Sequence, residues 1–370
     1  MIIGIIALCI LRLFFWRLFP QLGTGFLSDI VFATISLSAV TLYALSRTRS
    51  LLAPWIALWI IAVGLSTITS SSLPTTLGNW VILLTYALLF CAYHSMKKPS
   101  ETPLILWGVI GFGAILSALI GIWEFYILRT HHFLPGANLS LNIAFFMKRA
   151  CSLQGWPTAF AGALILTIPG VVFWFKEKPT PIKLFLVLIL IAGLLTSVSA
   201  LPILSLIIAI LLITQSKDAQ YGTLALCIVF FFVCGTKILD AFFSSRGEYY
   251  SAAWNMITQH PFLGGGFGNF RSFGTAKSAF VHNSYVQMWA ECGPLGLISL
   301  IGLALTFWKM KPTPNDLLQK AVYAGLLAVF IDNLFSFTIL KPNLSLIWWL
   351  SLAIYSTIWR GESDGINIRN

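Results

Sequence analysis

Residues 104–128 read LILWGVIGFGAILSALIGIWEFYIL, a run with a single charged side chain, Glu124. A run of this length can cross the hydrocarbon of a bilayer as a helix, which takes about 20 residues. The whole chain has this character, since 58% of its 370 residues are hydrophobic and only 9% are charged. A soluble domain carries about 25% charged residues, because it needs a wet surface. The composition therefore predicts a polytopic membrane protein.

Twelve apolar segments follow one another along the chain, and each is predicted to span the membrane. They lie at 2–19, 27–45, 51–69, 78–94, 104–128, 156–175, 183–199, 201–214, 221–236, 286–309, 320–338 and 343–359. The first has no small-residue cleavage site, so it is expected to remain as a span. Residues 183–214 could form one long helix kinked at Pro202, but two spans joined at Ser199–Leu201 fit the topology better. The predicted fold is an all-α bundle of about twelve spans, in a single integral membrane domain over residues 1–370.

The positions of Lys and Arg predict the orientation of this bundle. One set of alternate connections carries a basic residue in every member, so it is expected to be cytoplasmic, with both termini on the same side. That set contains Arg47, Arg49, Lys97, Lys98, Lys176, Lys178, Lys183, Lys217, Lys309, Lys311, Lys320 and Arg360. The two longest loops, 129–155 and 237–285, then lie on the outer face. The second of them connects the ninth and tenth spans.

The outer face retains cations that the charge rule does not favour there. They are Arg129, Lys148, Arg149, Lys237, Arg246, Arg271, Lys277 and Lys341. Their concentration on one face, mostly in its two longest loops, predicts a site for an anion, with phosphate or pyrophosphate favoured because arginine grips these groups bidentately. For any single residue the alternative is contact with anionic lipid headgroups or simple solvation.

His282 is the histidine best placed for chemistry. It precedes Asn283 at the mouth of a predicted span, directly after the long outer loop. Its imidazole, with an ordinary pKa near 6.5, can accept a proton at neutral pH and act as a general base. The alternative is a structural or helix-capping histidine. Asp332, within the eleventh span, is expected to pair with an arginine or with Lys341, because charges at membrane depth face the protein interior.

The glycine-rich run from Gly264 to Gly268 has a structural interpretation. A nucleotide-binding turn needs a preceding strand and a following helix, and this run is predicted on a face that lacks nucleotide. Gly264 and Gly266 are instead expected in a tight turn with positive φ that folds the loop back over the membrane. The six cysteines show neither a CxxC pair nor metal-ligand spacing. No cofactor, metal or nucleic acid is expected.

The segment from His282 onward resembles a known signature. His282-Asn283, nine further residues and then Gly293-Pro-Leu-Gly296 resemble the H-N-x9-G-x-x-G pattern of the O-antigen ligase and polymerase family. Glu291 is similar to the E-x-G element of that family. The motif resemblance covers about residues 246–300, and the resemblance in topology covers most of the chain.

The preceding loop resembles the same family. Arg246 and Trp254 stand ahead of HPFLGGGFGNF, which runs from His260 to Phe270. The sequence departs from the family near a span end, where many relatives carry a Ser-Arg pair and residues 196–202 read TSVSALP. Either Arg149 or Arg271 substitutes for the missing arginine, or the diphosphate is held differently.

The resemblance implies an inverting, metal-independent glycosyltransferase on the periplasmic face of the bacterial inner membrane. The donor would be a glycan on undecaprenyl pyrophosphate, and the favoured acceptor is a hydroxyl of lipid A-core, as in O-antigen ligases; membrane lipids are the remaining expected partners. A repeat-unit polymerase and a protein O-oligosaccharyltransferase are alternatives within the family. A transporter of lipid-linked glycan is the more distant alternative, and the absence of two related halves disfavours it.

The resemblance also implies roles for individual residues. His282 would deprotonate or orient the acceptor hydroxyl. Arginines would hold the diphosphate, with Arg246 favoured and Arg149 and Arg271 as further candidates. The remaining motif residues would have structural roles; they are Asn283, Glu291, Gly293, Gly296, Gly264 and Gly266.

Overall fold

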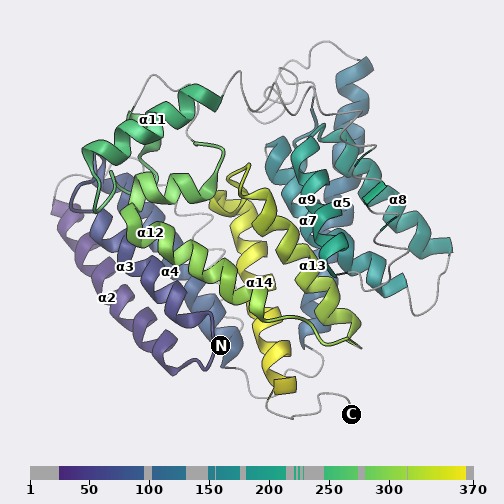
Figure 1. The fold of residues 1–370 in the computed structure, drawn as a ribbon, viewed down its shortest axis with the longest axis horizontal. Coiled ribbons are helices and arrows are strands. Elements are labelled where there is room, and N and C mark those ends of the chain that lie inside the picture. Colours follow the sequence, from purple (N-terminus) through teal and green to yellow (C-terminus); the bar gives the residue numbers. More distant parts are fainter. Residues whose placement is uncertain are drawn as a thin grey trace.

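The computed structural model describes residues 25–95, 102–130, 149–154, 156–175, 181–213, 246–273, 280–314 and 316–363, together with 221, 224, 225 and 228. In these ranges the regular structure is entirely helical, with eleven α-helices and three short 3₁₀-helices. Figure 1 shows the bundle that they form. The predicted span at 2–19, nearly all of the one at 221–236 and most of the outer loop 129–155 lie outside the described residues.

The ten other predicted spans each coincide with a helix. These helices are α2 (Gly25–Arg47), α3 (Ala53–Ser66), α4 (Leu73–His94), α5 (Thr102–Thr130), α7 (Pro157–Phe175), α8 (Pro181–Thr196), α9 (Ala200–Ile213), α12 (Ser284–Lys309), α13 (Leu317–Asp332) and α14 (Pro342–Ser363). The region 183–214 is two helices, α8 and α9, rather than one kinked helix. The remaining described α-helix, α11 (Arg246–Gln259), lies within the predicted long loop 237–285 and is less apolar than the helices that coincide with predicted spans.

Three of the described helices are long and apolar enough to cross a membrane, over Leu73–His94, Pro103–Ile127 and Ser284–Lys309. The distribution of polarity on the bundle fits the same environment. Large apolar side chains project outward from α5 and α8, such as Phe112 at 69% exposure and Phe185 at 62%, whereas Ser66 and Ser117 are fully buried. An apolar exterior around a partly polar interior is the arrangement expected of a protein in a bilayer.

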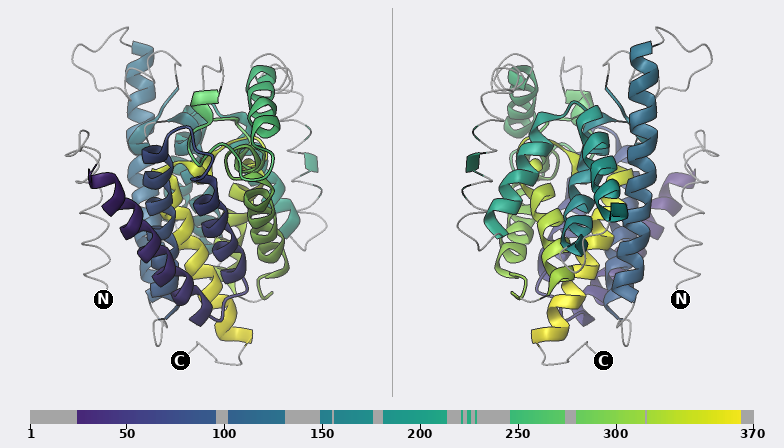
Figure 2. Two further views of the ribbon diagram at one scale, coloured as in Figure 1. Left: turned by 90° about the vertical axis from the view of Figure 1, so that its left-hand side faces the viewer. Right: turned by 90° about the vertical axis from the view of Figure 1, so that its right-hand side faces the viewer.

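The connections alternate between the two ends of the bundle. Figure 2 shows α11 at one end and the last turns of α14 at the other. At the α11 end, the Ala150 N–H donates to the Thr196 carbonyl at 3.1 Å and the Ser284 N–H donates to the Asn333 carbonyl at 3.0 Å. At the opposite end, the Tyr355 hydroxyl donates to the Met310 carbonyl. The α11 end therefore gathers the segments that carry His282 and its neighbours.

The helix over the eleventh predicted span is shorter than the sequence analysis expected. The segment was predicted to continue to residue 338, but α13 ends at Asp332 and is followed by a turn and the 3₁₀-helix η3 (Thr338–Leu340). The side chain of Asn333 stabilises this turn, because its Oδ1 accepts from the Ser284 hydroxyl at 2.6 Å and from the Ile339 N–H at 3.1 Å. Polar residues at the helix end thus bond locally instead of extending the helix, and the turn lies beside the start of α12.

Candidate functional site

His282 lies immediately before α12, in a backbone conformation with φ of 61°. A non-glycine residue in the left-handed region is uncommon and is found most often where the surrounding structure holds it. Here Asn283 provides that support as the N-cap of α12, since its Oδ1 accepts from the N–H groups of Tyr285 at 3.0 Å and Val286 at 3.1 Å. The His-Asn pair therefore forms the entrance to α12, with the asparagine as its cap.

Two aromatic rings from different segments hold the imidazole of His282. Tyr249 of α11 stacks on it, with ring centroids 5.4 Å apart, and Phe337 meets it edge to face at 4.8 Å. These contacts fix the ring between the outer helix α11 and the turn that follows α13. The site is thus assembled from residues nearly a hundred positions apart in the chain.

The pKa of His282 is lowered from 6.5 to about 4. Burial is the largest cause, and the positive charges of Arg246, Lys341 and Arg149 add to it in that order. At pH 7 the imidazole of His282 is therefore neutral, which is the protonation state that a general base requires. Positive charge from three separate segments therefore acts on one histidine. Lys341 is also linked to it through Phe337, whose ring contacts both side chains.

Arg246 is the first residue of α11 and is only 8% exposed. Burial lowers its pKa, while Tyr250 and Asp332 act in the opposite direction. Asp332 is fully buried at the end of α13 and accepts a hydrogen bond from the Thr338 hydroxyl at 3.0 Å. The charge of Asp332 acts on Arg246, because it raises the pKa that burial lowers. The pairing of Asp332 with an arginine or with Lys341 stays a prediction.

Arg149 lies ahead of α7, and its guanidinium reaches the turn between α8 and α9. Its Nε donates to the Ser197 carbonyl at 2.8 Å and its Nη2 to the Ser199 hydroxyl at 2.5 Å. Ser197 and Ser199 belong to the TSVSALP stretch that lacks the arginine of the resembled family. The structure thus places a guanidinium at that turn, supplied from residue 149, and burial lowers its pKa.

Glu124 anchors the segment that carries Arg149. Its Oε2 accepts from the N–H groups of Cys151 at 3.0 Å and Ser152 at 2.7 Å. Glu124 is only 6% exposed, so it is a buried anchor rather than a side chain extended to the membrane surface. Arg271, the third predicted arginine, is exposed on the 3₁₀-helix η2 (Phe270–Phe273) and is not among the charges that lower the pKa of His282.

Lys341 was not among the predicted site residues, although it was recognised as one of the outer-face cations. Its ammonium lies over three aromatic rings, 4.2 Å from the centroid of Phe280, 4.4 Å from Trp156 and 4.9 Å from Phe337. Burial lowers its pKa from 10.5 to about 8. The sequence could not predict that these three rings surround Lys341, because they come from distant segments that share no motif.

The glycine cluster packs on a break in α12. Gly293 has φ of 68° and ψ of −170°, and Pro294 follows it. Proline has no N–H, so the carbonyl of Ala290 loses its helical donor. The Gly265 N–H bonds that carbonyl and the Gly266 N–H bonds the carbonyl of Glu291, each at 3.0 Å. The loop thus supplies the donors that the break removes.

Close backbone approach explains why glycines stand at this junction. A Cβ at Gly264 would lie 2.3 Å from the carbonyl carbon of Glu291, and one at Gly293 would lie 2.2 Å from the carbonyl oxygen of Phe262. Gly264 and Gly266 both have positive φ, as expected from the sequence. At Gly296, one turn beyond the break, a Cβ would lie 2.5 Å from that of Cys292.

Glu291 has no exposed surface and serves as a tie between loop and helix. Its Oε1 accepts from the Phe270 N–H at 3.2 Å and from Gln287 Nε2 at 3.1 Å. Gln287 in turn accepts from the Val281 N–H at 3.3 Å, next to His282. Glu291 thereby connects the loop after α11 to α12 and, through Gln287, to the residue before His282.

The arrangement can bind an anion and accept a proton at adjacent points. A neutral imidazole experiences the positive charge of one lysine and two arginines, and the negative charge of Asp332 acts on one of those arginines, Arg246. Among the described residues, no three His, Cys, Asp or Glu side chains are grouped as metal ligands would be. Comparison with known proteins found no matching family model, no matching curated protein and no matching solved structure.

Proposed function

We propose that this protein is a membrane glycosyltransferase that transfers a glycan from undecaprenyl pyrophosphate to a hydroxyl acceptor on the periplasmic face of the bacterial inner membrane. The acceptor favoured by the resemblance is lipid A-core, which makes the protein an O-antigen ligase. The observation that carries the proposal is that Tyr249 and Phe337 hold His282, and that Lys341 lies over the same Phe337 ring. The charges of Arg246, Lys341 and Arg149 also act on this histidine and lower its pKa.

The charges match the donor. A pyrophosphate diester carries two negative charges, and arginine and lysine at one end of an apolar bundle supply the complementary field. The prenyl chain of such a donor needs a lipid phase directly beside the diphosphate site. Helices that can cross a membrane lead away from this end, including α12, which begins two residues after His282.

His282 would act as the base in a direct displacement. The acceptor O–H gives its proton to a ring nitrogen of His282 while its oxygen forms a bond to the anomeric carbon of the donor sugar. The bond from that carbon to the diphosphate breaks, and its electron pair leaves with undecaprenyl pyrophosphate, so the anomeric configuration inverts. The cations stabilise the charge that develops on the leaving group.

The electrostatics link the base to the donor. In the empty site the cations and burial lower the proton affinity of His282. A bound diphosphate offsets the charges of Arg246, Lys341 and Arg149, so it raises that affinity. The imidazole would thus become a stronger base when the donor is present and stay neutral when it is absent, which disfavours unproductive protonation.

The orientation follows from the predicted cytoplasmic connections. Arg47, Arg49, Lys309, Lys311 and Lys320 lie in connections or helix ends remote from α11. If this basic end is cytoplasmic, the His282 end opens to the periplasm. That face holds no nucleotide sugar, which agrees with a lipid-linked donor.

The test is surface polysaccharide profiling in a host that lacks the gene, complemented at equal expression with the wild type, His282→Ala or Lys309→Gln. Lys309 is the matched control, because it lies at the opposite end of the bundle. We expect deletion to leave polymerised glycan on the lipid carrier and none on lipid A-core. Lys309→Gln should restore transfer, whereas His282→Ala should lower it by about 10²–10⁴-fold, as expected for loss of a general base.

Other results would redirect the assignment. Accumulation of single capped repeats would indicate a polymerase, and loss of glycan from a protein would indicate an O-oligosaccharyltransferase. Full restoration by His282→Ala would contradict the catalytic role of the histidine and reopen the transporter alternative.

A further inference from the structure

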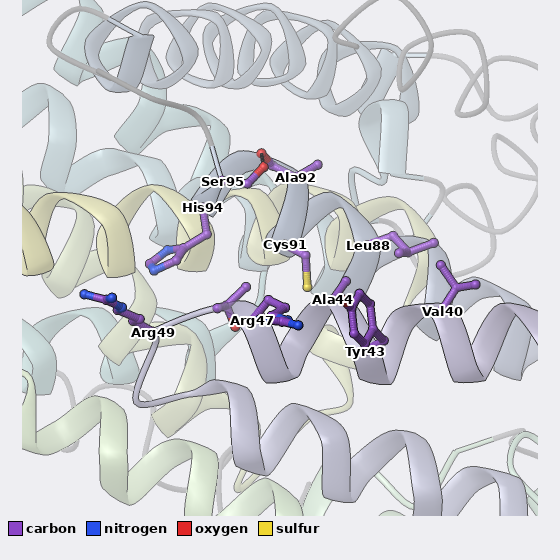
Figure 3. Close-up of a pocket in the computed structure, with 11 residues that line it drawn as sticks. Val40, Tyr43, Ala44, Arg47, Arg49, Leu88, Cys91, Ala92, His94 and Ser95 are labelled. Atoms are coloured by element: carbon purple, nitrogen blue, oxygen red, sulfur yellow. Dashed lines mark hydrogen bonds between the residues drawn. The ribbon is translucent and has the colours of Figure 1, made fainter.

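A second concave site lies at the end of the bundle opposite His282, between the last turns of α2 and α4. Figure 3 shows the pocket, whose volume is about 560 Å³. It shares no residue with the candidate active site. The inference drawn from it therefore does not rest on the proposed function.

The pocket changes in polarity along its length. In Figure 3, Arg49 and His94 lie toward one end, and Val40 and Leu88 lie toward the other. Val40 precedes Arg47 by two helical turns, which is about 10 Å along the axis. Because Arg47 is the last residue of α2, the cationic part is at the helix end and the apolar part extends toward the middle of the bundle. A headgroup and the start of an acyl chain have this same gradient.

The polar wall is held in place by its neighbours. His94 stacks on Phe90 at a centroid distance of 5.9 Å, and its Nδ1 lies 3.2 Å from the Thr357 hydroxyl of α14. The guanidinium of Arg47 lies over the ring of Tyr43 at 5.2 Å. The recess is therefore bordered by side chains with defined partners rather than by a loose surface.

The surroundings restrict what can occupy this pocket. α4 is one of the helices that can cross a membrane, and the side chains of Val40 and Leu88 give water few hydrogen-bond partners. Two exposed arginines at the rim attract an anion, and guanidinium matches the geometry of phosphate. A soluble phosphate would use the arginines and leave the apolar wall uncovered, whereas a lipid would cover both.

We propose that this pocket binds an anionic membrane phospholipid, with the phosphate at the rim that carries Arg47 and Arg49 and an acyl chain along Val40 and Leu88. The probe is phosphatidylglycerol. The protein is placed in nanodiscs of equal phosphatidylglycerol and phosphatidylcholine, and the lipids retained on release are counted by native mass spectrometry. The wild type should retain phosphatidylglycerol in preference to phosphatidylcholine.

Charge variants test the rim of the pocket. The double variant Arg47→Gln and Arg49→Gln should weaken retention by roughly 10–30-fold, because each cation near a membrane surface contributes about fivefold. Lys309→Gln with Lys311→Gln removes the same charge near the same end but outside the pocket, so it should retain the lipid as the wild type does. An equal loss of phosphatidylglycerol retention in both double variants would overturn the proposal. Retention would then depend on the general surface charge of this end and not on the pocket.

A filling variant tests the cavity itself. Ala44 lines the pocket, so Ala44→Trp should expel the acyl chain and lower retention without any change in charge. Unchanged retention in Ala44→Trp, or equal retention of phosphatidylcholine by the wild type, would overturn the lipid assignment. Displacement of phosphatidylglycerol by millimolar glycerol 3-phosphate would also overturn the lipid assignment, because it would show that the arginines bind a phosphate without an acyl chain. The two kinds of variant act on different parts of the pocket, so misfolding of one leaves the other informative.

Discussion

Binding of a diphosphate should make the protein take up a proton through His282. The perturbation is addition of geranyl diphosphate, a short prenyl diphosphate, to the purified protein at pH 5.5. In the empty site the pKa of His282 is about 4, so roughly 3% of the histidine is protonated at that pH. If the ligand returned the pKa to its ordinary 6.5, about 90% would be protonated. The upper limit is therefore about 0.9 proton per site.

The magnitude depends on how much of the lowered pKa comes from charge. The fall from 6.5 to about 4 corresponds to about 3 kcal/mol against the protonated form. Burial is the largest cause and persists when the ligand is bound, so the diphosphate cancels only the contributions of Arg246, Lys341 and Arg149. The measured uptake should thus fall between a few hundredths of a proton and the upper limit.

The assay is isothermal titration calorimetry in two buffers with different ionisation enthalpies. His282→Gln is the control, because it keeps a polar side chain of similar size and cannot titrate. Subtracting the variant also removes the protonation change of the ligand itself. Identical proton uptake by the wild type and His282→Gln would refute the reasoning, because it would mean that the bound diphosphate does not act on the histidine.

The same lowered pKa predicts an acid sensitivity of the fold. The folded state binds fewer protons than the unfolded state between pH 6.5 and about 4, so stability should fall as the pH drops through that window and level off below it. His282→Gln should lose this dependence. Apparent melting temperatures in detergent across pH 4–7 would show it as a gap between the two proteins, and a gap that does not vary with pH would contradict it.

Three further predictions concern the scaffold and the arginines. Gly293→Ala should lower the apparent melting temperature strongly, because the added Cβ would lie 2.2 Å from a backbone oxygen. Gly111→Ala is the control, since no atom lies within 4 Å of its added Cβ. It should leave the melting temperature in the same thermal scan nearly unchanged. Arg149→Lys should reduce kcat/KM about 10–100-fold in a transfer assay, because the variant loses both contacts of the guanidinium. Ser199→Ala removes only one of those two contacts and should cost less than about tenfold. Arg271→Gln should leave transfer within about twofold of the wild type; a loss as large as that of Arg149→Lys would show that the exposed arginine reaches the donor.

The sequence was sufficient for the ten helices that coincide with predicted spans, but not for α11, which lies in a segment predicted as a loop. Long apolar runs determine where helices form, because each run buries its own backbone hydrogen bonds. The end of α13 at Asp332 was not predicted, because apolar residues continue to Leu340. The side chains of Asn333 and Thr338 form hydrogen bonds within the turn and so favour the turn over further helix. Hydropathy alone does not reveal such bonds.

The surroundings of the histidine were only partly predictable. Arg246 stood out because it precedes a recognisable motif, and Arg149 because a span entrance follows it. Lys341 could be assigned to the outer face and no further, since its position depends on where the rings of Trp156, Phe280 and Phe337 meet. Tertiary contacts between distant segments carry no local pattern, so a single sequence cannot reveal them.

The spacing between His282-Asn283 and Gly293 has a physical meaning. Asn283 starts a helix, and the ten residues from Ser284 to Gly293 extend about 15 Å before the break. At the break, the carbonyls of Ala290 and Glu291 accept from the glycine loop that follows α11. That loop follows α11, the helix that begins at Arg246. The chain thus connects His282 to Arg246 through the first part of α12, the glycine loop and α11. Inserting or deleting one residue between Asn283 and Gly293 would rotate the carbonyls that bond the glycine loop by about 100° around the axis of α12. We expect this rotation to separate Arg246 from His282.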